Sequence, residues 1–82
     1  SDELYIEWLE RCGAKRVEVP QIGDVGVWKF GLAHSHGGIV VDAGEDPLIL
    51  HSYMKARRGV TLCRASEQPL AASESVQWWS VI

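Results

Sequence analysis

The 82-residue sequence lacks the marks of several large classes of protein. Two cysteines are too few for the disulfide framework of a small secreted domain. No apolar run approaches the roughly 18 residues of a membrane-spanning helix, so we expect no membrane span. Eight basic residues against eleven acidic ones give a net charge of −3, and we expect no nucleic-acid partner. The one dense basic run, 55–58, is expected to be a solvated polar turn.

The sequence does contain one amphipathic helix, expected at about residues 2–12. Leu4, Trp8, Leu9 and Cys12 recur at the spacing of one helix face. Gly13 can adopt the left-handed conformation that ends a helix. The sequence begins with Ser1 rather than Met, and we expect further residues upstream of it.

Beyond residue 20 the apolar pattern changes to the period of two that is typical of strands. We expect five strands, at about 24–30, 36–42, 48–54, 59–64 and 76–82. Residues 14–18 and 31–35 are expected to be connections, 43–47 a hairpin, and 66–72 a loop or one helical turn. The pattern therefore predicts a single α+β domain over 1–82, in which an N-terminal helix precedes a five-strand antiparallel meander or partial barrel.

The second and third expected strands are apolar on both faces. One helix cannot cover both faces of such a sheet. We therefore expect a partner against the sheet, either an upstream helix segment missing from this sequence or a second chain.

All three histidines lie in or near these two strands. His36 opens the second expected strand and His51 lies in the third, while His34 falls in the loop before them. If the hairpin pairs Asp42 with Glu45, His36 lies directly opposite His51. The Cβ atoms of such a pair are roughly 4.5–5.5 Å apart. A register slip of one residue would place the two side chains on opposite faces.

Two paired imidazoles suit a general base and the group that orients it. His36 would accept a nucleophile's proton near neutral pH, and His51 would fix its tautomer and ring angle. Gly37 and Gly38 follow His36 directly. We expect them to make room for a substrate strand or a nucleophile helix.

Two other interpretations of the histidines remain open. A strand histidine is often packed or hydrogen-bonded without being catalytic. Alternatively, His34, His36 and His51 provide three imidazoles, the number found in a catalytic zinc site, if all three share one face.

Several short motifs, in order, carry a resemblance to a known family. Residues 20–30 (PQIGDVGVWKF) resemble the entry strand of the NlpC-type cell-wall cysteine peptidases, with its P-x-x-GD-hydrophobic pattern. Residues 35–41 (SHGGIVV) and 48–53 (LILHSY) resemble that family's next two strands, which carry the catalytic base and the third member of the triad. Residues 76–82 (VQWWSVI) are similar to the last strand of the branch found in phage tails and gene-transfer particles.

The resemblance covers about residues 20–82. It implies a papain-like half domain with His36 as base, His51 as orienting partner and Asp24 in a structural turn. The implied reaction is hydrolysis of an amide bond in a peptidoglycan stem peptide, typically between D-glutamate and a diamino acid, without a metal or other cofactor. The implied location is a virion tail, or the bacterial cytoplasm before assembly. The alternative is a non-catalytic structural or binding module of tail assembly that keeps the fold.

The family's nucleophile motif, D-C-x-G, is absent from the 82 residues. Cys12 lies at the expected C-terminal end of the helix, where the helix dipole opposes a thiolate, and we expect it to be buried on the apolar face. Cys63 follows the histidines and is out of the family's order. We therefore expect either a nucleophile on an upstream segment or an inactive domain.

Overall fold

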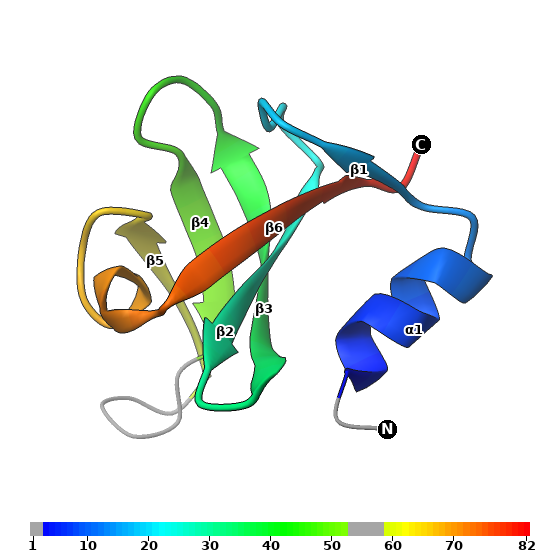
Figure 1. Cartoon of the computed structure of the whole chain (residues 1–82). Helices are drawn as coiled ribbons and strands as arrows, with labels where there is room; N and C mark the ends of the chain where they lie inside the picture. Colours follow the sequence, from blue (N-terminus) through cyan, green and yellow to red (C-terminus); the bar gives the residue numbers. More distant parts are fainter. Residues whose placement is uncertain (1–2, 53–58) are drawn as a thin grey trace.

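The computed structural model describes residues 3–52 and 59–82, which form a helix, a short 3-10 helix and one antiparallel layer of strands (Figure 1). The helix is α1 (Leu4–Arg11). The strands are β1 (Lys15–Val17), β2 (Val25–Phe30), β3 (Ala33–Asp42), β4 (Leu48–Ser52), β5 (Val60–Arg64) and β6 (Ser75–Ser80), and the short 3-10 helix η1 (Leu70–Ala72) precedes β6. The predicted α+β class is confirmed. The expected end of the third strand and the polar turn at 55–58 lie outside the described residues.

The described strands form one antiparallel sheet in the order β1-β6-β2-β3-β4-β5. Strands β2 to β5 follow one another as a meander, but β6 returns beside β2, and β1 adds to the outer edge of β6. The prediction of five strands was wrong because residues 15–17 pair with residues 78–80. Their partner lies at the other end of the chain, so the local pattern of a three-residue segment could not reveal it.

The turn between β2 and β3 is shorter than expected. β3 begins at Ala33, which pairs with Phe30, so only Gly31 and Leu32 connect the two strands. Gly31 has a φ of 74°, a conformation that glycine adopts without strain. The expected loop over 31–35 is therefore mostly strand, and His34 belongs to β3.

One face of the sheet carries the hydrophobic core. Trp28, Val40 and Ile49, from three neighbouring strands, are buried together with Leu70 of η1. Cys63, Val76 and Trp78 pack against this cluster. The 3-10 helix η1 thus covers this hydrophobic cluster through Leu70.

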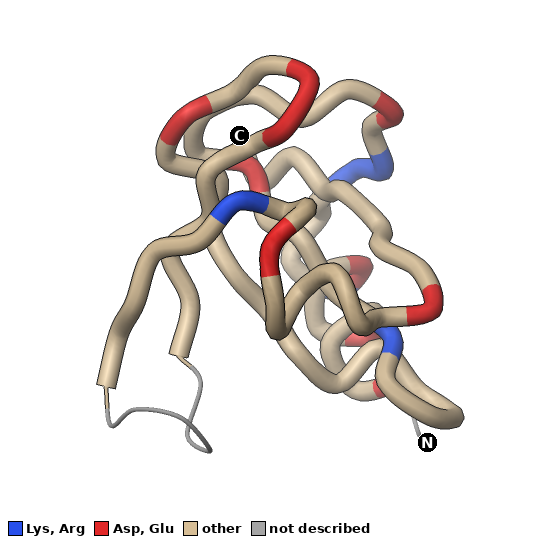
Figure 2. Tube along the Cα trace, turned by 90° about the vertical axis from the view of Figure 1, so that its left-hand side faces the viewer, with Lys and Arg blue, Asp and Glu red and all other residues tan. Residues whose placement is uncertain are grey.

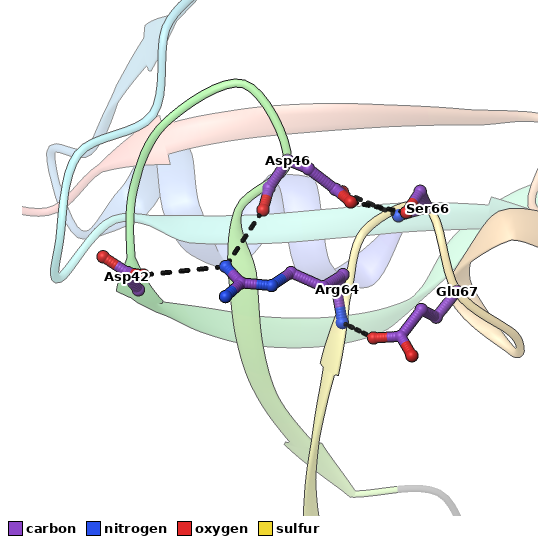
Figure 3. Close-up of polar contacts among 5 residues, drawn as sticks. All are labelled: Asp42, Asp46, Arg64, Ser66 and Glu67. Carbon is purple, nitrogen blue, oxygen red and sulfur yellow. Dashed lines mark hydrogen bonds and ion pairs between the residues drawn. The ribbon is translucent and has the colours of Figure 1, made fainter.

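Polar contacts hold the chain between β5 and η1 to the hairpin between β3 and β4 (Figure 3). The Arg64 guanidinium donates to the carbonyl of Asp46 at 3.2 Å and lies 3.6 Å from the carboxylate of Asp42. The backbone N–H and the hydroxyl of Ser66 both donate to the Asp46 carboxylate, and Glu67 accepts from the backbone N–H of Arg64. These contacts fix the position from which η1 starts.

α1 lies against β3 on the side of the sheet opposite the core cluster (Figure 1). It ends before Gly13, which has a φ of 80°, as predicted. The predicted packed face is wrong: Leu4 and Trp8 are 59% and 62% exposed, and Cys12 is exposed rather than buried. The helix instead turns Tyr5 toward the sheet, where its ring meets Gly37.

The α1 side of the sheet is also apolar beyond the helix. Ile39 pairs with Leu50, and Leu50 pairs with Leu62, which places the three side chains in one row across β3, β4 and β5. Ile39 is 47% and Leu62 is 53% exposed. This row agrees with the prediction that the central strands are apolar on both faces.

Along the trace of the described residues, acidic residues are more numerous than basic ones, and they are spread over several connections (Figure 2). In the same part of the chain, no helix is long and apolar enough to cross a membrane.

Candidate active site: two paired histidines and a cysteine

His36 and His51 meet on the core face of the sheet. Nε2 of His36 lies 2.8 Å from Nδ1 of His51, a hydrogen-bonding distance. Their rings are nearly perpendicular, with an interplanar angle of 80° and centroids 5.0 Å apart. The structure therefore brings together the two residues that the sequence singled out as base and orienting partner.

The two histidines meet through a different register from the one predicted. Gly38, not His36, lies opposite His51, and Asp42 pairs with Leu48 rather than with Glu45. The five-residue connection 43–47 and a bulge at Val41 shift the pairing by two residues. Side chains alternate with a period of two, so a shift of two preserves the face. His36 and His51 are therefore diagonal neighbours within reach of each other.

The two glycines after His36 serve packing inside the chain. A Cβ on Gly38 would lie 2.6 Å from Cγ2 of Ile49 and 3.2 Å from Cβ of His51. A Cβ on Gly37 would lie 3.0 Å from the Tyr5 ring on the opposite face. The expectation that these glycines leave room for a substrate strand or a nucleophile helix was therefore wrong: β4 and α1 occupy the space.

His34 is separated from the other two histidines by a bulge at Ser35. Trp28 pairs with His36 and Lys29 pairs with His34, so the two histidines, two residues apart, face opposite sides of the sheet. His34 Nδ1 lies 2.8 Å from a carboxylate oxygen of Glu3, and its backbone N–H donates to the other oxygen at 2.7 Å. His34 thus fastens the start of α1 to β3.

The bulge also removes the geometry for a three-imidazole zinc site. His34 cannot join His36 and His51 on one face. Within residues 3–52 and 59–82, no group of three histidine, cysteine or acidic side chains comes together as metal ligands would.

The surroundings of the histidine pair favour the neutral imidazoles. Burial lowers the pKa of His36 below its usual value, and the nearby His51 lowers it further. Burial also lowers the pKa of His51. Trp28 and Phe30 flank the His36 ring edge-on, with centroids 6.3 and 6.0 Å away. A neutral His36 keeps one unprotonated ring nitrogen at pH 7, as a general base requires.

Cys63 extends the pair into a row of three polar groups, which the sequence analysis missed. Its Sγ lies 3.2 Å from Nε2 of His51. Cys63 of β5 pairs with Ile49 of β4, so the two side chains lie on the same face of the sheet. His51 follows Ile49 by two residues in β4 and therefore lies on that face as well. The alternation of side chains in the two strands places Cys63 and His51 on one face once the strands are paired. The sequence gives no direct sign of that pairing, and the position of Cys63 after the histidines counted against it only as a nucleophile.

Neither cysteine is placed like the family's nucleophile. Cys12 is the exposed C-terminal cap of α1, and Cys63 contacts the far side of His51 rather than His36. Burial raises the pKa of the Cys63 thiol, Glu67 adds to this, and a backbone hydrogen bond from Leu70 opposes it. A thiol with a raised pKa is a poor source of thiolate at neutral pH.

Asp24 lies just before β2. Asp24 is buried and accepts a hydrogen bond from the backbone N–H of Gln21 at 2.8 Å, which makes it part of a turn.

A hollow of about 550 Å³ lies between the β1–β2 connection and the β3–β4 hairpin, where Pro20, Pro47 and Trp78 contribute to its walls. Neither His36 nor His51 lines it.

Comparison of the chain with known family models, with curated proteins and with solved structures finds no match.

Proposed function

We propose that this chain carries the general base and the orienting partner of a cysteine peptidase that hydrolyses amide bonds. His36 is the base and His51 is its partner. The observation that carries the proposal is the 2.8 Å contact between Nε2 of His36 and Nδ1 of His51. A base held by a second polar side chain is the arrangement that nucleophilic catalysis by a thiol needs.

In the proposed mechanism His51 contacts Nε2 of His36, and the imidazole of His36 takes the proton from the attacking thiol. The thiolate then adds to the amide carbonyl, and the imidazolium returns its proton to the nitrogen of the leaving amine as the C–N bond breaks. Water, deprotonated by the same imidazole, hydrolyses the resulting thioester. Throughout, His51 keeps the His36 ring in one orientation.

The substrate class rests on the resemblance to the NlpC-type peptidases. The motifs at 20–30, 35–41 and 48–53 lie in the same order as in that family. They correspond to the end of the β1–β2 connection with β2, to β3, and to β4. We propose a peptidoglycan stem peptide as substrate and a phage tail or related particle as the setting. The nucleophile would come from an upstream helix segment or a second chain outside these 82 residues.

The placement of the cysteines favours one alternative, a non-catalytic module of tail assembly that keeps the fold. Cys63 has a raised thiol pKa and contacts His51 rather than His36. In that case the histidine pair would serve only to stabilise the sheet.

The test is release of new amino groups from purified peptidoglycan by the complete product of the reading frame that encodes this chain. We expect His36→Ala to lower the rate by about 100-fold or more, the range for loss of a general base. His51→Ala should lower it less. Cys12→Ala, a change at an exposed helix end, is the matched control and should leave the rate unchanged. A wild-type protein that releases no amino groups, or a His36→Ala variant that keeps its rate, would favour the assembly module.

A further inference from the structure

The hollow of about 550 Å³ has the size of a site for a small ligand. Such sites usually have volumes of about 300–1,000 Å³. The hollow lies between the β1–β2 connection and the β3–β4 hairpin, which are found at the same end of the sheet (Figure 1). Neither His36 nor His51 lines it, so binding there would be independent of the proposed chemistry.

The walls of the hollow are mostly apolar and come from three parts of the chain. Val19 and Pro20 belong to the β1–β2 connection, Pro47 to the hairpin and Trp78 to β6. The Trp78 ring is held by the core, because it meets the Trp28 ring edge-on with centroids 5.4 Å apart. An apolar group that enters the hollow would therefore lose contact with water against surfaces that are already in place.

Backbone hydrogen bonds fix the two connections that form the hollow. In the β1–β2 connection the N–H of Gly23 donates to the carbonyl of Val40 at 2.8 Å, and the N–H of Val40 donates to the carbonyl of Asp24 at 2.9 Å. In the hairpin the carbonyl of Pro47 accepts from the N–H of Ala65 at 2.9 Å. The walls therefore need little ordering when a ligand binds, which favours affinity.

The charged residues that line the hollow have one sign. Glu18 comes from the β1–β2 connection and Glu45 from the hairpin, and among the described residues no lysine or arginine lines the hollow. Arg64, which precedes a lining residue, has its guanidinium 3.6 Å from the carboxylate of Asp42. A cationic ligand would be attracted to the hollow and an anionic ligand repelled. Trp78 adds an aromatic ring, the kind of group on which ammonium ions bind.

From these observations we propose that the hollow binds an ammonium group on a short apolar stem, the chemistry of a lysine side chain. The stem would lie against Pro20, Pro47 and Trp78, and the ammonium group would face Glu18 and Glu45. The two features are needed together. Apolar walls alone accept any apolar group, and exposed carboxylates alone attract any cation only weakly.

The test is an NMR titration of the 82-residue chain at pH 7.5 with three probes that share one stem: pentylamine, pentanol and pentanoate. We expect pentylamine to shift the indole N–H signal of Trp78 and the amide signals of Glu18, Val19 and Glu45, with a Kd in the millimolar range that suits so small a ligand. Pentanol, which lacks the charge, should bind about fivefold more weakly, and pentanoate more weakly still. Added salt should reduce the difference between pentylamine and pentanol.

Two kinds of variant separate the charge from the walls. Glu18→Gln/Glu45→Gln, at two exposed positions, should weaken pentylamine binding about fivefold and leave pentanol binding unchanged. Glu10→Gln/Glu74→Gln is the matched control, because it removes two charges from exposed positions outside the hollow, and it should bind as the wild type does. Val19→Ser, at a side chain that is 69% exposed, should weaken pentylamine and pentanol alike.

Three results would overturn the proposal. One is pentanoate that shifts the Trp78 signal at the same concentrations as pentylamine. Another is pentylamine that leaves the signals of the hollow unmoved. The third is an equal loss of affinity in the two double glutamate variants, which would reveal an effect of net charge rather than of the hollow. None of these results depends on hydrolysis, and His36→Ala should bind pentylamine as the wild type does.

Discussion

Gly38 sets how closely β3 and β4 approach beside the two histidines. It lies opposite His51, and its missing side chain leaves the space that Ile49 and the Cβ of His51 fill. The contact between His36 and His51 is diagonal, so it depends on this close approach. The sequence suggested that Gly38 leaves space for a ligand, but in the structure its missing side chain allows β4 to pack closely beside the two histidines.

We expect Gly38→Ala to destabilise the protein by about 1–3 kcal/mol, the usual cost of overpacking a core position. The new methyl group would lie 2.6 Å from Ile49 and would push β4 away, which also lengthens the contact between the histidines. Urea unfolding measures the stability, and the imidazole NMR signals report the contact.

Gly37→Ala is the matched control for this change. Its methyl group would meet only the ring of Tyr5 on the half-exposed side of α1, and alanine is favoured over glycine within a strand. We expect a change below about 1 kcal/mol and unaltered histidine signals. Equal losses in the two variants would contradict the role assigned to Gly38.

The lowered pKa values of His36 and His51 make stability depend on pH. Between their folded pKa values and the usual value near 6.5, the unfolded chain binds more protons than the folded one. The free energy of unfolding should therefore fall as the pH is lowered from 7.5 to 5.5. The carboxyls of Glu3 and Asp46 also have lowered pKa values, but they act only near and below pH 4.5.

We expect the double variant His36→Asn/His51→Asn to lose most of this slope, whatever its absolute stability. Urea unfolding at a series of pH values measures it. A slope equal to that of the wild type would mean that the two imidazoles are not the groups that resist protonation.

At the scale of the elements, two bulges decide which side chains meet. The bulge at Ser35 turns His34 away from His36. The bulge at Val41 changes the β3–β4 register by one residue, and together with the five-residue connection it gives the total shift of two from the expected pairing. The alternation of apolar residues predicts strands and their faces, because it follows from the pleat. It does not show where one extra residue is inserted, since that depends on the partner strand.

The attachment of α1 was equally hidden from the sequence. The spacing of Leu4 and Trp8 predicted the wrong face, because the helix is held by Glu3 and Tyr5 against a particular part of β3. We expect Glu3→Gln to weaken this attachment, since the change removes the charge from the hydrogen bonds to His34. Hydrogen exchange of the α1 amides should become faster while the β2–β4 amides keep their protection.

Glu10→Gln is the matched control, because it removes the same charge from an exposed position on the same helix. It should leave α1 exchange close to that of the wild type. Equal acceleration in both variants would point to a general effect of charge on the helix rather than to the contact between Glu3 and His34.

At the scale of the whole molecule, the sequence predicted the meander of the sheet but not the pairing of the strands β1 and β6 beside it. The meander β2–β5 and the helix follow from local periodicity and from turns at glycine. β1 and the placement of β6 beside β2 do not, since they join the two ends of the chain. The contact between His36 and His51 could be predicted because the actual β3–β4 pairing differs from the expected one by two residues, which keeps both side chains on the same face. The contact of Cys63 with His51 could not be predicted without the pairing of a further strand, β5, with β4.

The apolar row of Ile39, Leu50 and Leu62 predicts that the 82-residue chain associates with itself. Sedimentation velocity should show larger species as the concentration rises, and Leu62→Lys should reduce them. A chain that stays monomeric over the whole concentration range and binds no hydrophobic dye would contradict this prediction.

The central claim is that His36 withdraws a proton from a thiol, and the rate of thiol alkylation as a function of pH tests it most directly. The complete gene product is treated with iodoacetamide between pH 5 and 9, and each cysteine is followed by mass spectrometry. The account predicts one cysteine, outside these 82 residues, that reacts near neutral pH much faster than a free thiol and loses this reactivity in His36→Ala. A protein in which every cysteine reacts as an ordinary thiol, or in which His36→Ala leaves the fast cysteine unchanged, would contradict it.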